Sequence, residues 1–270
     1  LVAFLAAHNI PVPAVLQYLP EKRQILLEDL GDRTLESILP SLSRGERKIW
    51  YRRAIDLLLR LQSLPIQEGG RSVALRRAFD AVLYQWEFDH FREYGIEARR
   101  GKRLPPSDRS LFEEETRKLT RRLLSLPQVL THRDFQSRNL MVRGETLTLL
   151  DFQDALLGPP HYDLVALLRD SYVELEWETV ESLMNDYLNR SRGGMRLPPE
   201  EFKRFFDYLT VQRKLKDAGR FVYIDRVKKN SSFLKYIPAS LRYVREAMER
   251  RAELKPLLEL LGKYVPEMRS

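Results

Sequence analysis

The chain contains no cysteine among its 270 residues. Disulfide bonds, thiolate metal sites and a cysteine nucleophile are therefore excluded, and the composition fits a reducing compartment, so we expect a cytoplasmic protein. Histidine is scarce: the four residues stand at positions 8, 90, 132 and 161, without the spacing of a metal-binding motif. No apolar run approaches the roughly 18 residues that span a bilayer, so we expect no membrane segment.

Acidic residues are outnumbered, since 46 lysines and arginines face 38 aspartates and glutamates, a formal net charge of +8. This balance favours an anionic partner. We do not expect a nucleic acid, because the basic residues are dispersed through helical segments with acidic neighbours, as in "EEETRKLTRR". Basic arms interleaved with aromatic residues are missing, and a solvated basic surface is the simpler interpretation.

The chain opens Leu1-Val2-Ala3 without an initiator methionine. We therefore expect further residues upstream in the natural protein. Whether they include a targeting segment stays open.

Sequence patterns predict a helix end at residues 1–9, then two strands joined at Pro20-Glu21-Lys22-Arg23. Helical periodicity follows in residues 47–64, 77–95 and about 108–125. The expected buried stripes comprise Ile49, Trp50, Ala54, Leu57, Leu58 and Leu61 in the first helix, and Phe79, Leu83, Trp86, Phe91 and Tyr94 in the second. A second hairpin surrounds Arg143-Gly144-Glu145. From residue 162 the chain is helical again, with breaks at Gly193-Gly194 and Pro198-Pro199, so we expect an α+β fold.

Three polar residues around the second hairpin form the strongest functional signal. Asp134 precedes Asn139 by five positions, and the hairpin returns the chain to Asp151. We expect the three side chains to converge. Two carboxylates and an amide make a hard-oxygen site suited to Mg²⁺ and phosphate oxygens, and one carboxylate could stay free to accept a proton from a hydroxyl.

The spacing matches the kinase pattern H-R-D-x-x-x-x-N followed by D-F, here His132-Arg133-Asp134, Asn139 and Asp151-Phe152. "HRDFQSRNLM" and "LLDFQDALLGPPHYDLVALLRD" resemble the aminoglycoside-phosphotransferase-like family, which has the protein-kinase fold. Within it, "ILLEDLGDRTL" and "QRKLKDAGRF" are most similar to bacterial N-acetylmuramate and N-acetylglucosamine 1-kinases. The resemblance runs from about residue 10 to 245. Its motifs are specific for fold and phosphoryl transfer, and less so for the acceptor.

The resemblance implies a protein-kinase-like fold with a truncated N-terminal lobe. Residues 1–30 would be the remnant of that lobe with its hinge, and 31–270 a mostly helical C-terminal lobe. It implies Asp134 as catalytic base, and Asn139 and Asp151 as ligands of Mg²⁺ on ATP. Backbone groups of the inter-lobe linker would meet adenine; these residues are Glu28, Asp29 and Leu30.

Neighbouring residues are expected to be structural. Asp163 precedes an apolar helical segment, so we expect it to cap a helix. His132 and Arg133 are expected to hold the loop.

Two departures from the kinase pattern matter. Gln153 and Asp154 stand where a kinase has the D-F-G glycine and the start of an activation loop, which favours a small-molecule acceptor over a protein. In addition, no glycine precedes Gly31, and the only earlier lysine, Lys22, lies in the expected hairpin turn. The Gly-rich loop and strand lysine that cover the phosphates in kinases are missing, so we expect little activity from residues 1–270 alone.

The acceptor site is the least defined part. In "LYQWEFDHF", Trp86 could stack on a sugar, and Glu87, Asp89 and His90 could bind hydroxyls. The alternative for Trp86 is a core position on one stripe with Phe91. Three functions stay open: an ATP-dependent kinase for an amino sugar, a catalytically silent nucleotide-binding module, and an aminoglycoside antibiotic phosphotransferase. The donor, ATP or GTP, and the oligomeric state are not determined by the sequence.

Overall fold

The computed structural model describes residues 1–70, 72–191 and 197–269. The helix break expected at Gly193-Gly194 lies outside them. Internal contacts divide the chain into two compact units, one made of Leu1–Ala78 with Gln128–Arg196 and the other of Phe79–Pro127 with Leu197–Ser270. Neither unit begins or ends near residue 30, where the sequence predicted a boundary between two lobes. That lobe boundary stays a prediction.

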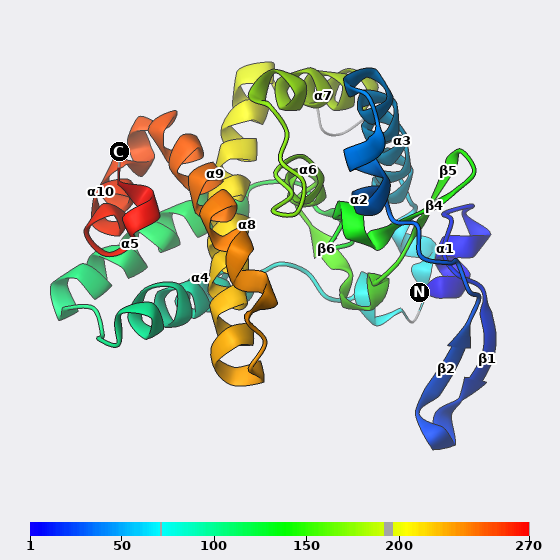
Figure 1. The fold of residues 1–270 in the computed structure, drawn as a ribbon, viewed down its shortest axis with the longest axis horizontal. Helices are drawn as coiled ribbons and strands as arrows, with labels where there is room; N and C mark the ends of the chain where they lie inside the picture. Colours follow the sequence, from blue (N-terminus) through cyan, green and yellow to red (C-terminus); the bar gives the residue numbers. More distant parts are fainter. Residues whose placement is uncertain (71, 192–196, 270) are drawn as a thin grey trace. The chain divides into compact units, whose positions relative to one another are not determined.

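The first unit combines short strands with helices (Figure 1). Its helices are α1 (Val2–Ala7), α2 (Leu35–Ile38), α3 (Arg44–Gln62), α6 (His161–Leu168) and α7 (Trp177–Arg190). Its strands are β1 (Val15–Leu19), β2 (Gln24–Leu27), β3 (Val129–Thr131), β4 (Leu140–Arg143), β5 (Thr146–Leu149) and β6 (Leu156–Gly158). The strands pair antiparallel as β1 with β2, β3 with β6 and β4 with β5.

Both expected hairpins are present. The β1–β2 connection is the short 3₁₀ turn Pro20–Lys22, after which Arg23 has φ 52°. The β4–β5 hairpin pairs Arg143 with Thr146, and Gly144 has φ +56°, a backbone conformation that glycine adopts without steric cost. These turns were predictable because their chemistry is local.

Helix α3 begins with a reciprocal cap that its sequence encodes. The Ser43 side chain accepts from the Glu46 amide, and the Glu46 carboxylate accepts from the Ser43 amide. Ala54, Leu57, Leu58 and Leu61 are buried as expected. Ile49 is 50% exposed, so the stripe begins later than predicted, at Tyr51.

Helix α6 forms the centre of the first unit. Every residue from His161 to Leu168 is buried, which fits a helix that is apolar on nearly all sides. The segments before it are fixed by β3–β6 pairing, in which Leu130 faces Leu157. The catalytic-loop candidate leaves β3 directly, so this packed centre determines where the loop begins.

The second unit is helical. It contains α4 (Ala81–His90), a π-helical segment (Phe91–Ala98), α5 (Pro106–Leu123), α8 (Pro199–Lys228), α9 (Ile237–Glu249) and α10 (Lys255–Tyr264). Helix α8 starts at Pro199, as the Pro198-Pro199 pair predicted. It is the central helix of this unit, in contact with α4, α5 and α9.

The π-helical segment packs closely on α8. A Cβ added at Gly219 would lie 2.8 Å from the Phe91 Cα and 3.2 Å from the His90 carbonyl oxygen. Glycine at this position therefore permits backbone-to-backbone contact between the two elements. π-helical turns occur mostly as local bulges and are frequent at functional sites.

None of the described helices is both long and apolar enough to cross a bilayer.

Candidate active site

Residues 132–139 form a tight loop between β3 and β4. Arg133 has φ +74°, unusual for a residue other than glycine. The Gln136 amide donates to the Asp134 carbonyl at 2.8 Å, and the Asn139 amide donates to the Gln136 carbonyl at 2.9 Å. The loop thus turns twice within a few residues and returns the chain to β4.

A continuous hydrogen-bond network connects this loop with the residue before Asp151. His132 Nε2 donates to the Leu150 carbonyl at 2.6 Å, and His132 Nδ1 accepts from the Asp134 amide at 3.2 Å. The Leu150 amide donates to the Asn139 carbonyl at 2.9 Å. The carbonyl oxygen at Nε2 is an acceptor and the amide N–H at Nδ1 is a donor, so these contacts fit the ring tautomer with its proton on Nε2. His132 therefore holds the backbone, as the sequence suggested for it.

Asn139 and Asp151 are each positioned by this network. Asn139 Nδ2 donates to the Asp134 carbonyl at 2.8 Å, which leaves Oδ1 as the amide atom that can face a cation. Asp151 has φ +57° and follows Leu150 directly, where the chain turns away from β5. The structure thus brings Asp134, Asn139 and Asp151 into one connected substructure. Their catalytic roles stay predictions.

The donor set fits a cation that retains other ligands. Among the described residues, no group of three or more histidine, cysteine, aspartate or glutamate side chains could enclose a metal ion. One carboxylate and one amide oxygen would be two ligands. Mg²⁺ in kinases takes few ligands from the protein and the others from phosphate and water, so Asn139 and Asp151 fit that chemistry.

Asp163 does not cap α6, contrary to the prediction. Pro160 occupies the N-cap position, without a side-chain hydrogen bond. The Asp163 carboxylate accepts from the His132 amide at 2.6 Å and from the Arg133 amide at 3.0 Å. It is fully buried. Its role is to hold the two backbone amides that precede Asp134, a contact between segments that local sequence does not reveal.

The sequence did not predict that a second buried carboxylate, Asp170, also supports the loop. Its Oδ2 accepts from the Ser137 amide at 2.9 Å and from the Ser137 hydroxyl at 2.6 Å. Its Oδ1 accepts from the Tyr172 amide at 3.0 Å. The one available signal was an acid two residues after Leu168, the end of the apolar run of α6, since a carboxylate is costly to bury without partners. Asp163 and Asp170 together fix both halves of the loop.

The linker candidates lie after β2. Glu28 accepts from Arg143 Nη1 at 2.6 Å, and its backbone amide donates to the Ala14 carbonyl at 2.8 Å. Hydrogen bonding to the Ala14 amide and to Arg143 lowers the pKa of the Glu28 carboxyl. Asp29 accepts from the amide of Gly31, which has φ +73°. Leu30 lies between them, half-buried. Contact with adenine stays a prediction for all three linker residues.

The acceptor candidates on α4 do not converge. Glu87 is fully buried and accepts from Gln212 Nε2 at 2.5 Å. His90 is 9% exposed and lies against the rings of Trp86, Tyr94 and Tyr223.

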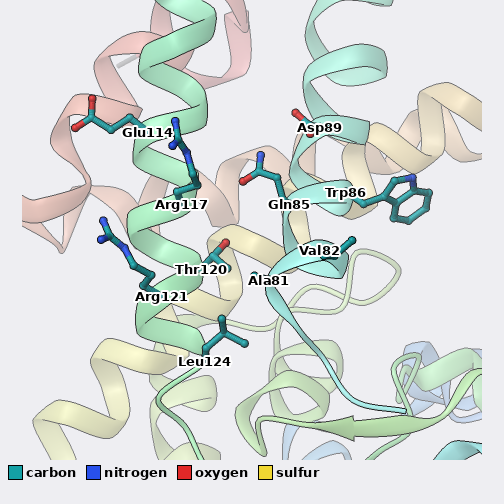
Figure 2. A pocket seen from close by; sticks show the side chains of 10 residues that line it. All are labelled: Ala81, Val82, Gln85, Trp86, Asp89, Glu114, Arg117, Thr120, Arg121 and Leu124. Carbon is teal, nitrogen blue, oxygen red and sulfur yellow. The ribbon is translucent and has the colours of Figure 1, made fainter.

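Trp86 and Asp89 instead line a groove between α4 and α5 (Figure 2). Trp86 is 56% exposed, so the alternative of a core position is wrong, whereas Phe91 is buried. The five positions between them correspond to about 140° around an α-helix, too far for one face. The sequence stripe therefore joined residues that point in different directions.

The sequence of this chain is similar to those of known phosphotransferases. The family model described as "Phosphotransferase enzyme family" matches residues 1–198. An N-acetylmuramate/N-acetylglucosamine kinase of Neisseria meningitidis is 36% identical over 94% of this chain and 75% of its own length. The kinase of that name from Pseudomonas aeruginosa is 32% identical over 96% of this chain and 75% of its own.

Solved structures establish the fold. The ADP-bound aminoglycoside phosphotransferase APH(2'')-Ib has a TM-score of 0.61 at 19% identity, with 91% of this chain and 80% of that one covered. The amicoumacin kinase hAmiN has a TM-score of 0.62 at 13% identity, with 93% and 76% covered. The expected kinase-like fold and the resemblance stated from the sequence are both confirmed. With the catalytic-loop spacing, the family model and these relatives in agreement, the chain belongs to the phosphotransferase enzyme family.

Proposed function

We propose that the protein is an ATP- and Mg²⁺-dependent kinase that phosphorylates a hydroxyl of an amino sugar related to N-acetylmuramate or N-acetylglucosamine. The observation that carries the proposal is the network that joins Asp134, Asn139 and Asp151 through His132 and Leu150. The names of the two relatives above support the sugar as acceptor.

Asp134 orients the acceptor hydroxyl and takes its proton while the bond from that oxygen to the γ-phosphorus forms. The bond from the γ-phosphorus to the bridging oxygen breaks, and ADP leaves with that electron pair. Asn139 Oδ1 and the Asp151 carboxylate would hold Mg²⁺, whose charge would neutralise part of the charge on the phosphates. Asp163 and Asp170 keep the loop in the shape that this requires.

The test is ATP turnover by the full natural chain with Mg²⁺ and, in separate assays, N-acetylmuramate, N-acetylglucosamine and kanamycin. We expect sugar-dependent turnover that falls by about 10²–10⁴-fold in Asp134→Asn. Asp154→Asn makes the same chemical change at an exposed neighbouring carboxylate and should retain activity.

The other outcomes separate the alternatives. Turnover with kanamycin alone would identify an antibiotic phosphotransferase. ATP binding without turnover on any acceptor would identify a silent nucleotide-binding module. Either result would overturn the sugar-kinase proposal.

We also propose that residues 1–270 alone turn ATP over poorly. The single lysine before Gly31, Lys22, lies in the turn between β1 and β2, where it is exposed. Among the described residues of the first unit, no glycine-rich turn precedes β1. Comparable turnover by residues 1–270 and by the full natural chain would contradict this proposal.

A further inference from the structure

The segment that follows the linker runs antiparallel to β4 in the first unit. Three contacts join the two segments: the Glu28 carboxylate with the Arg143 guanidinium at 2.6 Å, the Arg33 carbonyl with the Val142 amide at 2.7 Å, and a bridge between Thr34 and Met141. Strand β4 begins directly after Asn139. The contacts therefore lead from the linker along β4 to the residue proposed as a ligand of Mg²⁺.

Arg138 provides the next contact in this series. It lies in the short 3₁₀ turn Ser137–Asn139, inside the candidate catalytic loop. Its Nε lies 3.6 Å from Oε2 of Glu36 on α2. Leu35, the residue before Glu36, is fully buried, so α2 is anchored in the first unit and presents Glu36 from a fixed position.

A second contact of Arg138 comes from the segment after α6. The guanidinium carbon of Arg138 lies 3.9 Å from the centre of the Tyr172 ring, which is a cation–π contact. Asp170, two residues earlier, accepts from the amide and the hydroxyl of Ser137 and also from the Tyr172 amide. The segment after α6 therefore contacts both residues of the turn that precede Asn139.

The contacts of Arg138 contribute little to the stability of the fold. Its side chain is 34% exposed and that of Glu36 is 28% exposed, and ion pairs near the surface contribute about 0–1 kcal/mol. A cation–π contact adds about 0.5–1 kcal/mol at such a site. In contrast, a displacement of about 1 Å in a catalytic group can lower the rate about 10²-fold. These contacts can therefore matter far more for the position of Asn139 than for stability.

We infer that Arg138 is a positioning residue that couples the linker to the metal site. Its contacts with Glu36 and Tyr172 fix the turn from which Asn139 Oδ1 would meet Mg²⁺. Without Arg138 the turn can move, and the cation is then held less tightly, while the nucleotide itself loses no contact. The inference rests on the proposed function, since it takes Asn139 as a ligand of Mg²⁺ on the nucleotide.

The experiment is isothermal titration of the full natural chain with ADP, once in the presence of Mg²⁺ and once with EDTA. The variants are Arg138→Gln, Glu36→Gln and the two changes together. Arg190→Gln is the matched control. The Arg190 side chain is 32% exposed and pairs with Asp56 at 2.7 Å, so the same kind of contact is removed between α7 and α3 instead of at the loop.

Arg138→Gln should raise the Kd of ADP about ten-fold in the presence of Mg²⁺, the lower end of what the loss of a group that orients a metal ligand costs. With EDTA the Kd should equal that of the wild type, because Asn139 then holds no cation. Glu36→Gln should act in the same direction. The double variant should bind like Arg138→Gln, because the ion pair is already absent there. Arg190→Gln should match the wild type in both titrations.

The kinase assay gives a second measurement. In Arg138→Gln the KM for Mg²⁺ should rise, while the KM for the acceptor should stay at the wild-type value. A residue that only supported the fold would not separate the two constants.

Three results would overturn the inference: a wild type that binds ADP equally with Mg²⁺ and with EDTA, an Arg138→Gln variant that binds ADP like the wild type in Mg²⁺, or a loss of binding that is the same in EDTA. Circular dichroism of each variant checks folding, and Glu36→Gln removes the same ion pair from α2, so it keeps the test valid if Arg138→Gln does not fold.

The proposed function fails separately. Mg²⁺-dependent binding of ADP that needs Arg138, with no phosphoryl transfer to any acceptor, would refute the kinase and leave the role of Arg138 intact. Phosphoryl transfer that does not depend on Arg138 at limiting Mg²⁺ would do the reverse.

Discussion

The Asp163 carboxylate accepts hydrogen bonds from two consecutive backbone amides, those of His132 at 2.6 Å and Arg133 at 3.0 Å. Arg133, the second of these two residues and the one directly before Asp134, has φ +74°. A backbone conformation of this kind costs free energy and persists where surrounding contacts fix it. The link from α6 to the loop is therefore the contact that determines the direction in which Asp134 leaves β3.

Replacement of Asp163 by Asn should weaken this link. The neutral amide has one acceptor oxygen for two donors, so one buried N–H loses its partner, and the free energy of unfolding should fall by about 1–3 kcal/mol. Turnover should fall as well, because the loop no longer holds Asp134. Urea unfolding and the sugar-kinase assay measure the two effects. Wild-type stability together with wild-type turnover would contradict the role assigned to Asp163.

Arg143→Gln tests the contact between the β4–β5 hairpin and the linker. The Arg143 guanidinium donates to Glu28 at 2.6 Å, but its side chain is 54% exposed, and exposed ion pairs contribute little to stability. We expect an unchanged free energy of unfolding within about 0.5 kcal/mol. If the linker meets adenine, the KM for ATP should rise while kcat is retained. An unchanged KM for ATP would remove Arg143 from any role in positioning the linker.

Gly219→Ala should destabilise the second unit. The added methyl would lie 2.8 Å from the backbone of Phe91, and backbone cannot move aside as a flexible side chain can. Overpacking of this kind costs about 1–3 kcal/mol. Gly45→Ala on α3 is the matched control, because a Cβ there meets nothing within 4 Å and alanine is the better helix former. Thermal unfolding of both variants measures the difference. Equal effects would show that α8 and the π-helical segment can separate without cost.

His90 should make stability depend on pH. Burial, followed by the positive charges of Arg220 and Lys216, lowers the pKa of His90 from 6.5 to about 4. The unfolded chain therefore binds a proton between pH 6.5 and about 4 that the folded chain does not. The resulting stability is present above pH 6.5 and is lost as the pH falls toward 4.

His90→Gln should remove this part of the pH dependence. Urea unfolding from pH 7.5 down to pH 4.5, about the range in which a histidine of ordinary pKa becomes protonated, measures the slope. The variant and the wild type should have parallel curves above pH 7, where the ring is neutral in both the folded and the unfolded state. Parallel curves at low pH too would refute the lowered pKa.

Local chemistry allowed much of this protein to be predicted from its sequence. The turns at Pro20–Lys22 and Gly144, the start of α8 at Pro199 and the spacing of Asp134, Asn139 and Asp151 depend on residues close together in the chain. Backbone preferences and hydrophobic periodicity act over that range. The sequence thereby determined the family and the segment that carries the kinase-like spacing, whereas the catalytic roles of its residues stay predictions.

Contacts between distant segments decided the rest. Asp163 and Asp170 accept hydrogen bonds from loop residues that lie 31 and 33 positions away in the sequence. Glu87 accepts a hydrogen bond from Gln212, which lies 125 positions away. Whether a carboxylate on a helix is a cap, a surface charge or a buried support depends on which segment packs against it, and that partner is not encoded nearby. Likewise, packing of the π-helical segment against α8 buries Phe91, while Trp86 stays exposed. The tertiary structure alone placed Trp86 and Asp89 of α4 on a groove shared with α5, because the exposure of a side chain is set by its neighbours in space rather than in sequence.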